Sequence, residues 1–265
     1  FIPRITGADD WWCTLYSEPG SGSDLASLQT RAVKDGDDYI INGQKIWTSG
    51  GHLADWGWLA ARTDPDAPKH KGITMFMVNM KSPGVTVRPL INIADRHGFN
   101  EVFFEDVRVP AKQVVGEVNR GWYHMAVALD FERSGIQAYA GGRKHVERIT
   151  RIAKEHPELV ERRPSIRMEL ADRFVEVNVG TFMAYRVAHM QAAGLVPNHE
   201  ASVSKLFGSE MSQRISLTGI HLLGLAGELR NGSPYEIEDE ASSYLQSVSS
   251  TIAAGTSREI AAYTG

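Results

Sequence analysis

The chain has little cysteine and no long apolar run. Cys13 is the single cysteine among 265 residues, which excludes an intrachain disulfide and a metal site built from several cysteines. No apolar stretch approaches the roughly 20 residues that a membrane-spanning helix needs. The 28 Lys and Arg residues do not outnumber the 32 Asp and Glu residues, so the net charge of −4 gives no reason to expect nucleic acid or an anionic membrane as a partner.

Motifs of several enzyme classes are also missing. The nine histidines show no His-Glu-x-x-His or comparable spacing, so no metal site is expected. No Gly-x-Ser-x-Gly nucleophile elbow occurs, and Cys13 in its apolar stretch is interpreted as a small buried residue rather than a nucleophile. The first four residues, Phe-Ile-Pro-Arg, do not have the layout of a signal peptide. Together with the single cysteine, this favours a cytoplasmic location.

Residues before Pro110 have the pattern of β-strands. Asp35-Gly36 and Asn42-Gly43 each lie between strand-like runs, and each is a strong signal for a two-residue hairpin turn. Two hairpins so close together indicate an antiparallel meander, closed into a small barrel or sandwich. The predicted strands are 11–17, 29–34, 38–41, 44–48, 56–62, 73–80, 85–90 and 101–109.

After Pro110 the period becomes helical. The predicted helices are 121–156, 165–194, 201–223 and 238–253, separated by proline and glycine. Strands followed by helices predict an α+β chain rather than alternating βαβ units. We expect a β-barrel domain over residues 1–115 and a helical domain over residues 116–265.

A stripe at helical spacing marks the first predicted helix: Met125, Leu129, Glu132, Ile136 and Tyr139. Steps of four and three place all of them on one face of a continuous helix. A carboxylate on an apolar stripe is costly unless it is paired or protonated, so Glu132 is a candidate for a raised pKa and a chemical task. The alternative is a Glu at the edge of the stripe that pairs with Arg133 or Arg143.

Two loops carry further candidate chemistry. Residues 17–24, Ser-Glu-Pro-Gly-Ser-Gly-Ser-Asp, combine glycines with hydroxyls and could cradle a phosphate or a polar cofactor, although an ordinary surface turn has the same composition. The loop is neither a P-loop nor a Rossmann fingerprint. In the other loop, Trp47 with Thr48 and Ser49 could wall an aromatic cofactor, or Trp47 could be a core residue of the barrel.

Five segments together resemble the acyl-CoA dehydrogenase family. They are YSEPGSGSD at 16–24, NGQKIWTS at 42–49, NEVFFEDVRVP at 100–110, LDFER at 129–133 and IAAGTS at 252–257. The resemblance implies a β-barrel followed by a C-terminal four-helix bundle, with FAD bound between the two and an N-terminal helical domain before them. The chain begins where the barrel of the family begins. The family forms dimers or tetramers, so a homo-oligomer is expected, with a hetero-oligomer as the other arrangement.

The resemblance also assigns roles to individual residues. It places the Ser17 hydroxyl at the pyrimidine side of the flavin, Trp47 against the isoalloxazine and Ser49 toward flavin N5. Ser23 lies near the flavin diphosphate and the CoA arm of the substrate. The remaining cofactor contacts implied by the resemblance are Leu15, Thr48, His221, Gly224 and Thr256. From the sequence alone, His221 on its apolar helix end reads as a satisfied core histidine.

The catalytic base is implied by a subset of the family. Many members carry a Glu immediately before the Gly-Thr segment, but here Ala254 stands at that position and cannot accept a proton. Members resembling isovaleryl-CoA and long-chain dehydrogenases place the Glu directly before an Arg on a helix, as in Glu132-Arg133. Asp130 and Arg133 then match positions near the thioester of the substrate.

The implied reaction is the α,β-dehydrogenation of an acyl-CoA thioester in fatty acid metabolism. Glu132 would remove the α-proton, flavin N5 would accept the β-hydrogen as hydride, and the electrons would pass to an electron-transfer flavoprotein. Two alternatives stay open. One is a half-site or non-catalytic subunit of a hetero-oligomer, because Arg-x-x-Phe-Gly is missing between Arg148 and Pro164. The other is a flavin-dependent monooxygenase or oxidase on the same fold.

Overall fold

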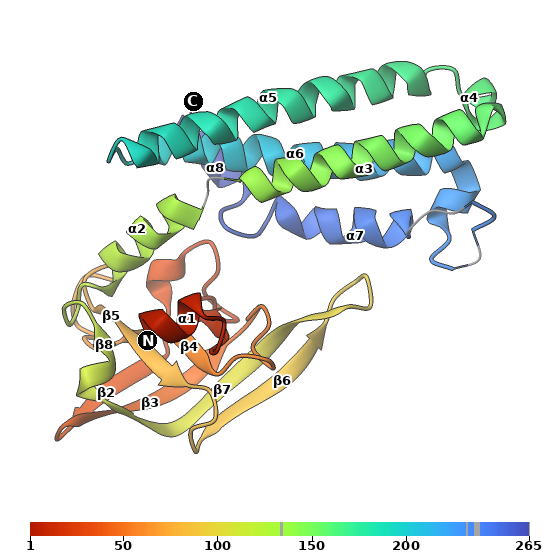
Figure 1. Cartoon of the computed structure of the whole chain (residues 1–265). Helices are drawn as coiled ribbons and strands as arrows, with labels where there is room; N and C mark the ends of the chain where they lie inside the picture. Colours follow the sequence, from red (N-terminus) through yellow and green to blue (C-terminus); the bar gives the residue numbers. More distant parts are fainter. Residues whose placement is uncertain (133–134, 232, 236–238, 265) are drawn as a thin grey trace. The chain divides into compact units, whose positions relative to one another are not determined.

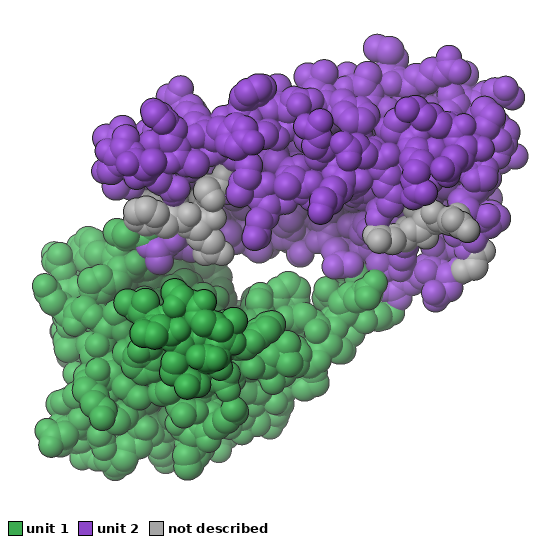
Figure 2. Space-filling model, viewed as in Figure 1, with its two compact units in different colours: residues 1–127 green, residues 128–265 purple. Residues whose placement is uncertain are grey.

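A computed structural model describes residues 1–132, 135–231, 233–235 and 239–264, without the side chains of 130–132, 263 and 264. The chain divides into two compact units, Phe1–Val127 and Ala128–Gly265, coloured green and purple in Figure 2. Each unit is described by itself.

Unit 1 contains a mixed β-sheet (Figure 1). Its strands are β1 (Trp12–Leu15), β2 (Arg31–Asp35), β3 (Asp38–Lys45), β4 (Trp56–Arg62), β5 (Ile73–Asn79), β6 (Val85–Ile91), β7 (His97–Pro110) and β8 (Val114–Val115). The order is β6-β7-β3-β2-β4-β5-β8, and β1 also pairs with β4. Helix α1 (Ile2–Thr6) precedes β1, and the short helices η1 (Leu25–Ser27) and η2 (Ala111–Gln113) lie between strands.

The strands pair mostly as the sequence predicts. β2 and β3 form the hairpin expected around Gly36, and β3·β7, β4·β5, β5·β8 and β6·β7 are also antiparallel. The β1·β4 and β2·β4 pairs are parallel, which the hairpin signals could not reveal because these strands are not adjacent in the chain. The α+β class is confirmed, with a sheet that is mixed rather than wholly antiparallel.

The second predicted hairpin, at Asn42-Gly43, is wrong. β3 continues through both residues and pairs with β7, which bulges so that Ile41 faces Val107 while Gly43 faces Phe104. Asn42 stabilises this bulge through two hydrogen bonds: its Nδ2 donates to Asp106 Oδ1 at 2.9 Å, and its Oδ1 accepts the Asp106 N–H at 2.9 Å. Gly43 is needed for close packing, because a Cβ there would lie 2.6 Å from Thr30 Oγ1.

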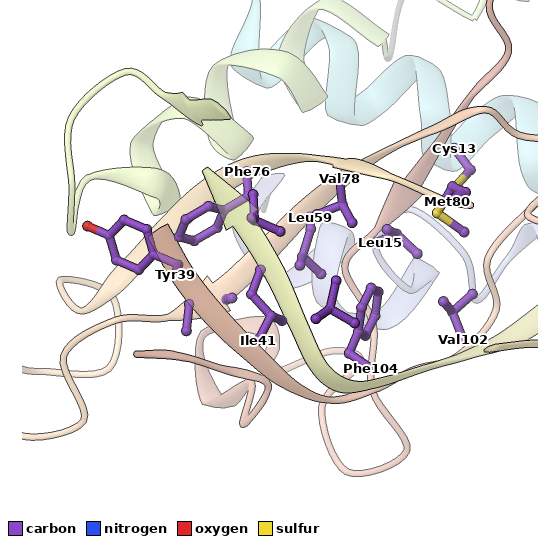
Figure 3. Close-up of a cluster of buried hydrophobic side chains, with 14 of the residues drawn as sticks. Cys13, Leu15, Tyr39, Ile41, Leu59, Phe76, Val78, Met80, Val102 and Phe104 are labelled. Carbon is purple, nitrogen blue, oxygen red and sulfur yellow. The ribbon is translucent and has the colours of Figure 1, made fainter. Parts of the chain in front are cut away.

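Strands β4 and β5 are buried on both faces. One face carries the main core of unit 1, where Leu59 and Phe76 pack with Leu15, Ile41 and others (Figure 3). The other face packs Ala60 and Met75 against Met125 of helix α2 (Gly121–Glu132). Because alternate residues of a strand point to opposite faces, two cores require apolar residues at nearly every position of β4 and β5.

Unit 2 is a helical bundle. It contains α3 (Ile136–Glu155), α4 (Pro157–Arg162), α5 (Ile166–Ala192), α6 (Asn198–Leu223), η3 (Gly224–Glu228), α7 (Glu240–Ser250) and α8 (Ser257–Thr264). Tyr139 of α3 lies at its centre: the ring packs against Gly180 of α5 and Gly208 of α6, and the hydroxyl donates to the Ser204 carbonyl at 2.6 Å. The fully buried ring therefore leaves no room for a Cβ at Gly180, which would lie 2.0 Å from it, and little room at Gly208, where the nearest atom of Tyr139 would be 3.2 Å away.

The predicted helix 121–156 is divided into α2 and α3. Gly135, which precedes α3, has a φ of +74°, a left-handed conformation that interrupts a right-handed helix. Met125 belongs to a core cluster of unit 1 and Tyr139 to the core of unit 2. The prediction that the stripe from Met125 to Tyr139 lies on one face of a continuous helix is therefore wrong.

Candidate functional site

A buried ion pair fixes the loop at 17–24 in unit 1. Lys45 Nζ, at the end of β3, lies 2.8 Å from Glu18 Oε1 and also donates to the Tyr16 carbonyl at 2.9 Å. Glu18 additionally accepts the backbone N–H groups of Gln29 and Thr30, at 2.6 and 2.9 Å. These buried contacts therefore hold the loop in a fixed conformation, which an ordinary surface turn would not have.

The electrostatics of this pair follow from its burial. Burial lowers the pKa of Lys45 to about 8, against the opposing attraction of the Glu18 carboxylate. For Glu18, burial acts to raise the pKa, but the Lys45 charge and the hydrogen bonds from Lys45, Thr30 and Gln29 outweigh it and hold the pKa below its usual value. The carboxylate form of Glu18 is thus favoured inside the fold.

The loop lies beside the tryptophan segment. The Ile46 N–H donates to the Ser17 carbonyl at 2.9 Å, so the residue before Trp47 is joined to the start of the loop. Ser17 is half-buried, whereas Ser23 and Ser49 are exposed. The structure therefore brings the Ser17 and Trp47 segments together within unit 1. Leu15 differs from these residues, because its side chain is fully buried in the barrel core.

Trp47 is not a core residue. Its side chain is 55% exposed, and its φ of +60° is a conformation that bulky residues avoid. An edge-to-face contact with Phe99, at 6.0 Å between ring centroids, supports the indole. An exposed tryptophan in strained backbone points to a functional role rather than to packing.

Asn100 holds the neighbouring residue in place. Its backbone carbonyl accepts the Thr48 N–H and its side-chain Nδ2 donates to the Thr48 carbonyl, both at 3.0 Å. His52 and His97 stack at 4.0 Å between ring centroids, and each contacts the Asn100 amide. The Thr48 hydroxyl is buried and has no hydrogen-bond partner in the described part of the chain.

The candidates of unit 2 lie at two separate places. His221 is near the C-terminal end of α6, where its Nδ1 lies 2.9 Å from Glu169 Oε2 and 3.2 Å from Arg163 Nη2. A single Nδ1 cannot donate to the carboxylate and accept from the guanidinium at once, and the shorter contact, to Glu169, is the hydrogen bond. Burial acts to raise the pKa of Glu169, but the hydrogen bonds from His221 and Arg163 hold it below its usual value.

Thr256 lies at the other end of α6. Its N–H and hydroxyl contact Glu259 Oε2 at 3.1 and 3.0 Å at the start of α8, and Lys205 Nζ donates to the adjacent Gly255 carbonyl at 2.5 Å. Lys205 and His221 are separated by about 24 Å along α6, from a rise of about 1.5 Å per residue. The structure therefore does not bring Thr256 together with His221. Gly224, with a φ of +59°, ends α6 on the His221 side.

The catalytic candidate falls on the undescribed region. Glu132 is the last residue of α2, but its side chain, that of Asp130, and the whole of Arg133 lie outside the described residues. Their roles stay predictions from the sequence. Elsewhere, no group of three His, Cys, Asp or Glu side chains suited to a metal is present among the described residues. No helix in the described ranges combines the length and apolar character that crossing a bilayer requires.

Comparison with models of known families assigns the chain to a family. The family model "Acyl-CoA dehydrogenase, C-terminal domain" matches residues 119–261, more than half of the chain, and "Acyl-CoA dehydrogenase, middle domain" matches residues 13–107. The chain belongs to the acyl-CoA dehydrogenase family. The resemblance drawn from the motifs is confirmed, and the relatives are oxidoreductase enzymes.

Individual members of the acyl-CoA dehydrogenase family match nearly the whole chain. FadE34 of Mycobacterium tuberculosis is 36% identical over 256 residues, which are 97% of this chain and 34% of that protein. The chain thus spans about a third of that curated relative. Among solved structures, the Tcur3481-Tcur3483 steroid ACAD is 31% identical with a TM-score of 0.90, over all of this chain and 69% of its own. The ChsE4-ChsE5 complex from Mycobacterium tuberculosis is 31% identical with a TM-score of 0.89, over all of this chain and 70% of its own.

The motifs assign no role to several residues that organise this part of unit 1. Glu18, Lys45 and Asn100 lie within the motifs without a predicted role, although they hold the Ser17 and Trp47 segments in place. The alternation of β3 indicates that Lys45 is buried, because Lys45 is an even number of residues from Tyr39 and Ile41, which are both buried. A lysine that points inward requires a buried acidic partner.

Proposed function

We propose that the chain provides the barrel and bundle of an FAD-dependent acyl-CoA dehydrogenase. The substrate is an acyl-CoA thioester, the product is the 2-enoyl-CoA, and an electron-transfer flavoprotein takes the electrons. The observation that carries the proposal is the exposed indole of Trp47 in strained backbone beside the loop at 17–24.

The polar groups of unit 1 fit a flavin. An exposed aromatic face suits a planar ring system, and the partnerless Thr48 hydroxyl is a buried group whose desolvation costs about 1–3 kcal/mol unless a ligand bonds to it. Ser17, Ser23 and Ser49 are the further hydroxyls proposed to hold the cofactor. Leu15, as a residue of the barrel core, is proposed to act through its backbone.

The proposed chemistry divides between the cofactor and the chain. A bound flavin supplies the redox chemistry by accepting the β-hydrogen of the substrate as hydride. Glu132 removes the α-proton, and a base for so weak an acid works best when its pKa is near the working pH. Asp130 and Arg133 bind near the thioester, and Ser23 also contacts the CoA arm. In unit 2, His221, Gly224 and Thr256 are proposed as additional cofactor contacts.

The wider setting is part of the same proposal. We infer a role in fatty acid and related acyl metabolism, a cytoplasmic location and a homo-oligomeric assembly. The single cysteine, which is buried, is compatible with a reducing compartment. Membership of a family whose named relatives are dehydrogenases supports the reaction class.

Two spectroscopic measurements on the full chain test the proposal. FAD titration should quench tryptophan fluorescence and give a bound flavin spectrum, and anaerobic addition of an acyl-CoA should then bleach the flavin. Glu132→Gln should retain FAD and lose bleaching. Glu147→Gln, on an exposed face of α3, is the matched control and should bleach as wild type. Bleaching at the wild-type rate in Glu132→Gln would refute the assignment of the base, and rapid peroxide release would indicate an oxidase instead.

A second candidate is a half-site subunit of a hetero-oligomer. Ala254 at the position where many relatives carry the base favours it, as do two similar structures whose names join two different chains. This candidate predicts that the chain alone does not bind FAD at any practical concentration. The proposed dehydrogenase predicts binding by the chain itself.

A further inference from the structure

Three side chains next to the segment that carries Trp47 form a hydrogen-bonded cluster with no part in the proposed chemistry. His52, in the loop that follows Ser49, and His97, the first residue of β7, stack with 4.0 Å between ring centroids and 25° between ring planes. Both rings contact the amide of Asn100, a fully buried residue. We call these three residues the amide–histidine cluster. Both histidines are exposed, so their rings exchange protons with solvent.

The hydrogen bonds determine which ring nitrogen carries a proton. The Thr48 carbonyl can only accept, so the Asn100 atom that lies 3.0 Å from it is the amide nitrogen. The same nitrogen lies 3.2 Å from His52 Nδ1, which must therefore accept and carry no proton. The amide oxygen lies 2.9 Å from His97 Nε2, which must therefore donate. The cluster thus requires a neutral His52 with its proton on Nε2.

A further proton affects the two rings differently. His97 can take one on Nδ1 and still donate from Nε2 to Asn100. A proton on His52 Nδ1 instead opposes two donors, the imidazole N–H and the amide N–H, and removes that hydrogen bond. Two charged rings stacked at 4.0 Å also repel each other. Acid therefore breaks the cluster at the contact between His52 and Asn100.

The charges around the cluster do not offset a proton on His52. The charged residues of the neighbouring segments are Lys45, Asp55, Arg88, Asp95, Arg96 and Glu101. Asp55 pairs with Lys81 at 2.7 Å. Glu101 accepts a hydrogen bond from Gln44 at 3.1 Å. Among the described residues, no ion pair joins either ring of the cluster to a carboxylate.

The cluster supports the strained backbone at Trp47. Phe99 contacts the indole, and the next residue, Asn100, makes two hydrogen bonds to the backbone of Thr48. The bond between Asn100 and His52 ties the far end of the same loop to this point. A φ of +60° persists in a tryptophan only while the surrounding contacts hold it. Loss of the His52 bond therefore changes the position of the indole.

We propose that the amide–histidine cluster positions Trp47 only while His52 is neutral, so that acid weakens the flavin site. His52, His97 and Asn100 are positioning residues, since they act on the cofactor through Trp47 and Thr48. The effect on FAD rests on the proposed function, whereas the response of Trp47 to the protonation of His52 does not. The two steps are therefore measured separately.

Nuclear magnetic resonance of the full chain, with ¹⁵N-labelled histidine and tryptophan, tests the first step. At the basic end of the range in which a histidine changes charge, about pH 8, both rings of the cluster should carry their proton on Nε2. Between about pH 8 and pH 5, the indole signal of Trp47 should shift together with the ring signals of His52. Trp47→Phe identifies the indole signal by its loss. In His52→Asn the indole signal should stay constant over the same range.

FAD titration tests the second step. The wild type should bind FAD about five- to tenfold more weakly at the acidic end of that range, as expected for the loss of one hydrogen bond. His52→Asn keeps an acceptor, its amide oxygen, that does not titrate, so this variant should lose the pH dependence. His52→Ala has no acceptor and should bind FAD weakly at both ends of the range.

The controls separate this effect from a general response to acid. His70→Asn makes the same substitution in the loop between β4 and β5 and should keep the wild-type pH dependence. Circular dichroism should give the same spectrum for every variant compared. A Trp47 signal that does not follow His52, or an unchanged pH dependence in His52→Asn, would overturn the proposal. Absence of FAD binding at every pH would contradict the proposed function instead, and the Trp47 signal would then decide the proposal alone.

Discussion

Lys45 Nζ and Glu18 Oε1 lie 2.8 Å apart, with 0% and 6% of their side chains exposed. One residue ends β3 just before the Trp47 segment, and the other belongs to the loop that carries Ser17 and Ser23. The ion pair therefore joins the two segments of unit 1 that we propose to hold the flavin. Removing one partner leaves an unpaired charge in a buried site.

We predict that Glu18→Ala destabilises the protein by about 3–5 kcal/mol, because it strands the buried ammonium of Lys45. The free energy of unfolding from urea denaturation, followed by tryptophan fluorescence, measures the effect. The control is the double variant Glu18→Leu/Lys45→Met, which removes both charges and should be more stable than Glu18→Ala. Equal stability of the two variants would mean that the ion pair does not carry the effect.

The same pair gives stability a defined pH dependence. The pKa of Glu18 is lowered in the fold from 4.5, so its stabilising contribution is complete above that pH and is lost as the pH falls through the folded value. The pKa of Lys45 is lowered from 10.5 to about 8, so the folded protein releases this proton first and the contribution of Lys45 to stability rises between those values. Unfolding of wild type and Lys45→Met should diverge in slope over that range, and parallel curves would contradict the prediction.

Much of the fold could be predicted because most of its signals are local. The bounds of β4 are those expected, and α6 ends at Leu223 as predicted. The failures arise where a distant residue decides the conformation. Asn42-Gly43 has the composition of a turn, yet the bulge at Asp106 and the close approach of Thr30 keep β3 extended there. No local pattern contains that information.

The candidate site also combines features that local motifs predict with features that depend on residues distant in the chain. The motifs predict that Ser17 and Trp47 contact a cofactor, but they do not reveal that Thr48 is held by hydrogen bonds to Asn100, which is more than fifty residues away in the chain. The helical stripe also misled, because its spacing assumes a continuous helix and Gly135 interrupts it. The periodicity of apolar residues describes one helix or strand at a time. It therefore cannot show that Met125 and Tyr139 are buried in different hydrophobic cores.

Glycine packing in the bundle gives a prediction with a matched control. A Cβ at Gly180 would lie 2.0 Å from the fully buried ring of Tyr139, whereas a Cβ at Gly141 meets nothing within 4 Å. Gly180→Ala should therefore destabilise the bundle by about 1–3 kcal/mol or more. Gly141→Ala, within α3, should stabilise it by about 0.5–1 kcal/mol. Thermal unfolding measures both, and the same sign of change in the two variants would refute the packing argument.

Two substitutions of Trp47 distinguish the cost of its strained backbone from the role of its indole. At a φ of +60° a residue other than glycine pays about 1–3 kcal/mol, and glycine pays little. Trp47→Gly and Trp47→Ala both remove the indole and its contact with Phe99, so they differ in this strain and in the larger entropy that glycine has in the unfolded chain. We expect Trp47→Gly to be the more stable of the two by about 1 kcal/mol in urea unfolding.

Both variants at Trp47 should bind FAD more weakly than wild type, with a shifted flavin absorption spectrum, because both lack the aromatic face. The readout is an FAD titration followed by flavin absorbance, alongside Phe103→Ala as a control on the same sheet. If Trp47→Gly gained stability yet bound FAD with wild-type affinity and spectrum, the strained tryptophan would have no part in the cofactor site. A loss of affinity in both variants, whatever their stability, would tie the indole to cofactor binding, since the indole is the feature they share in losing.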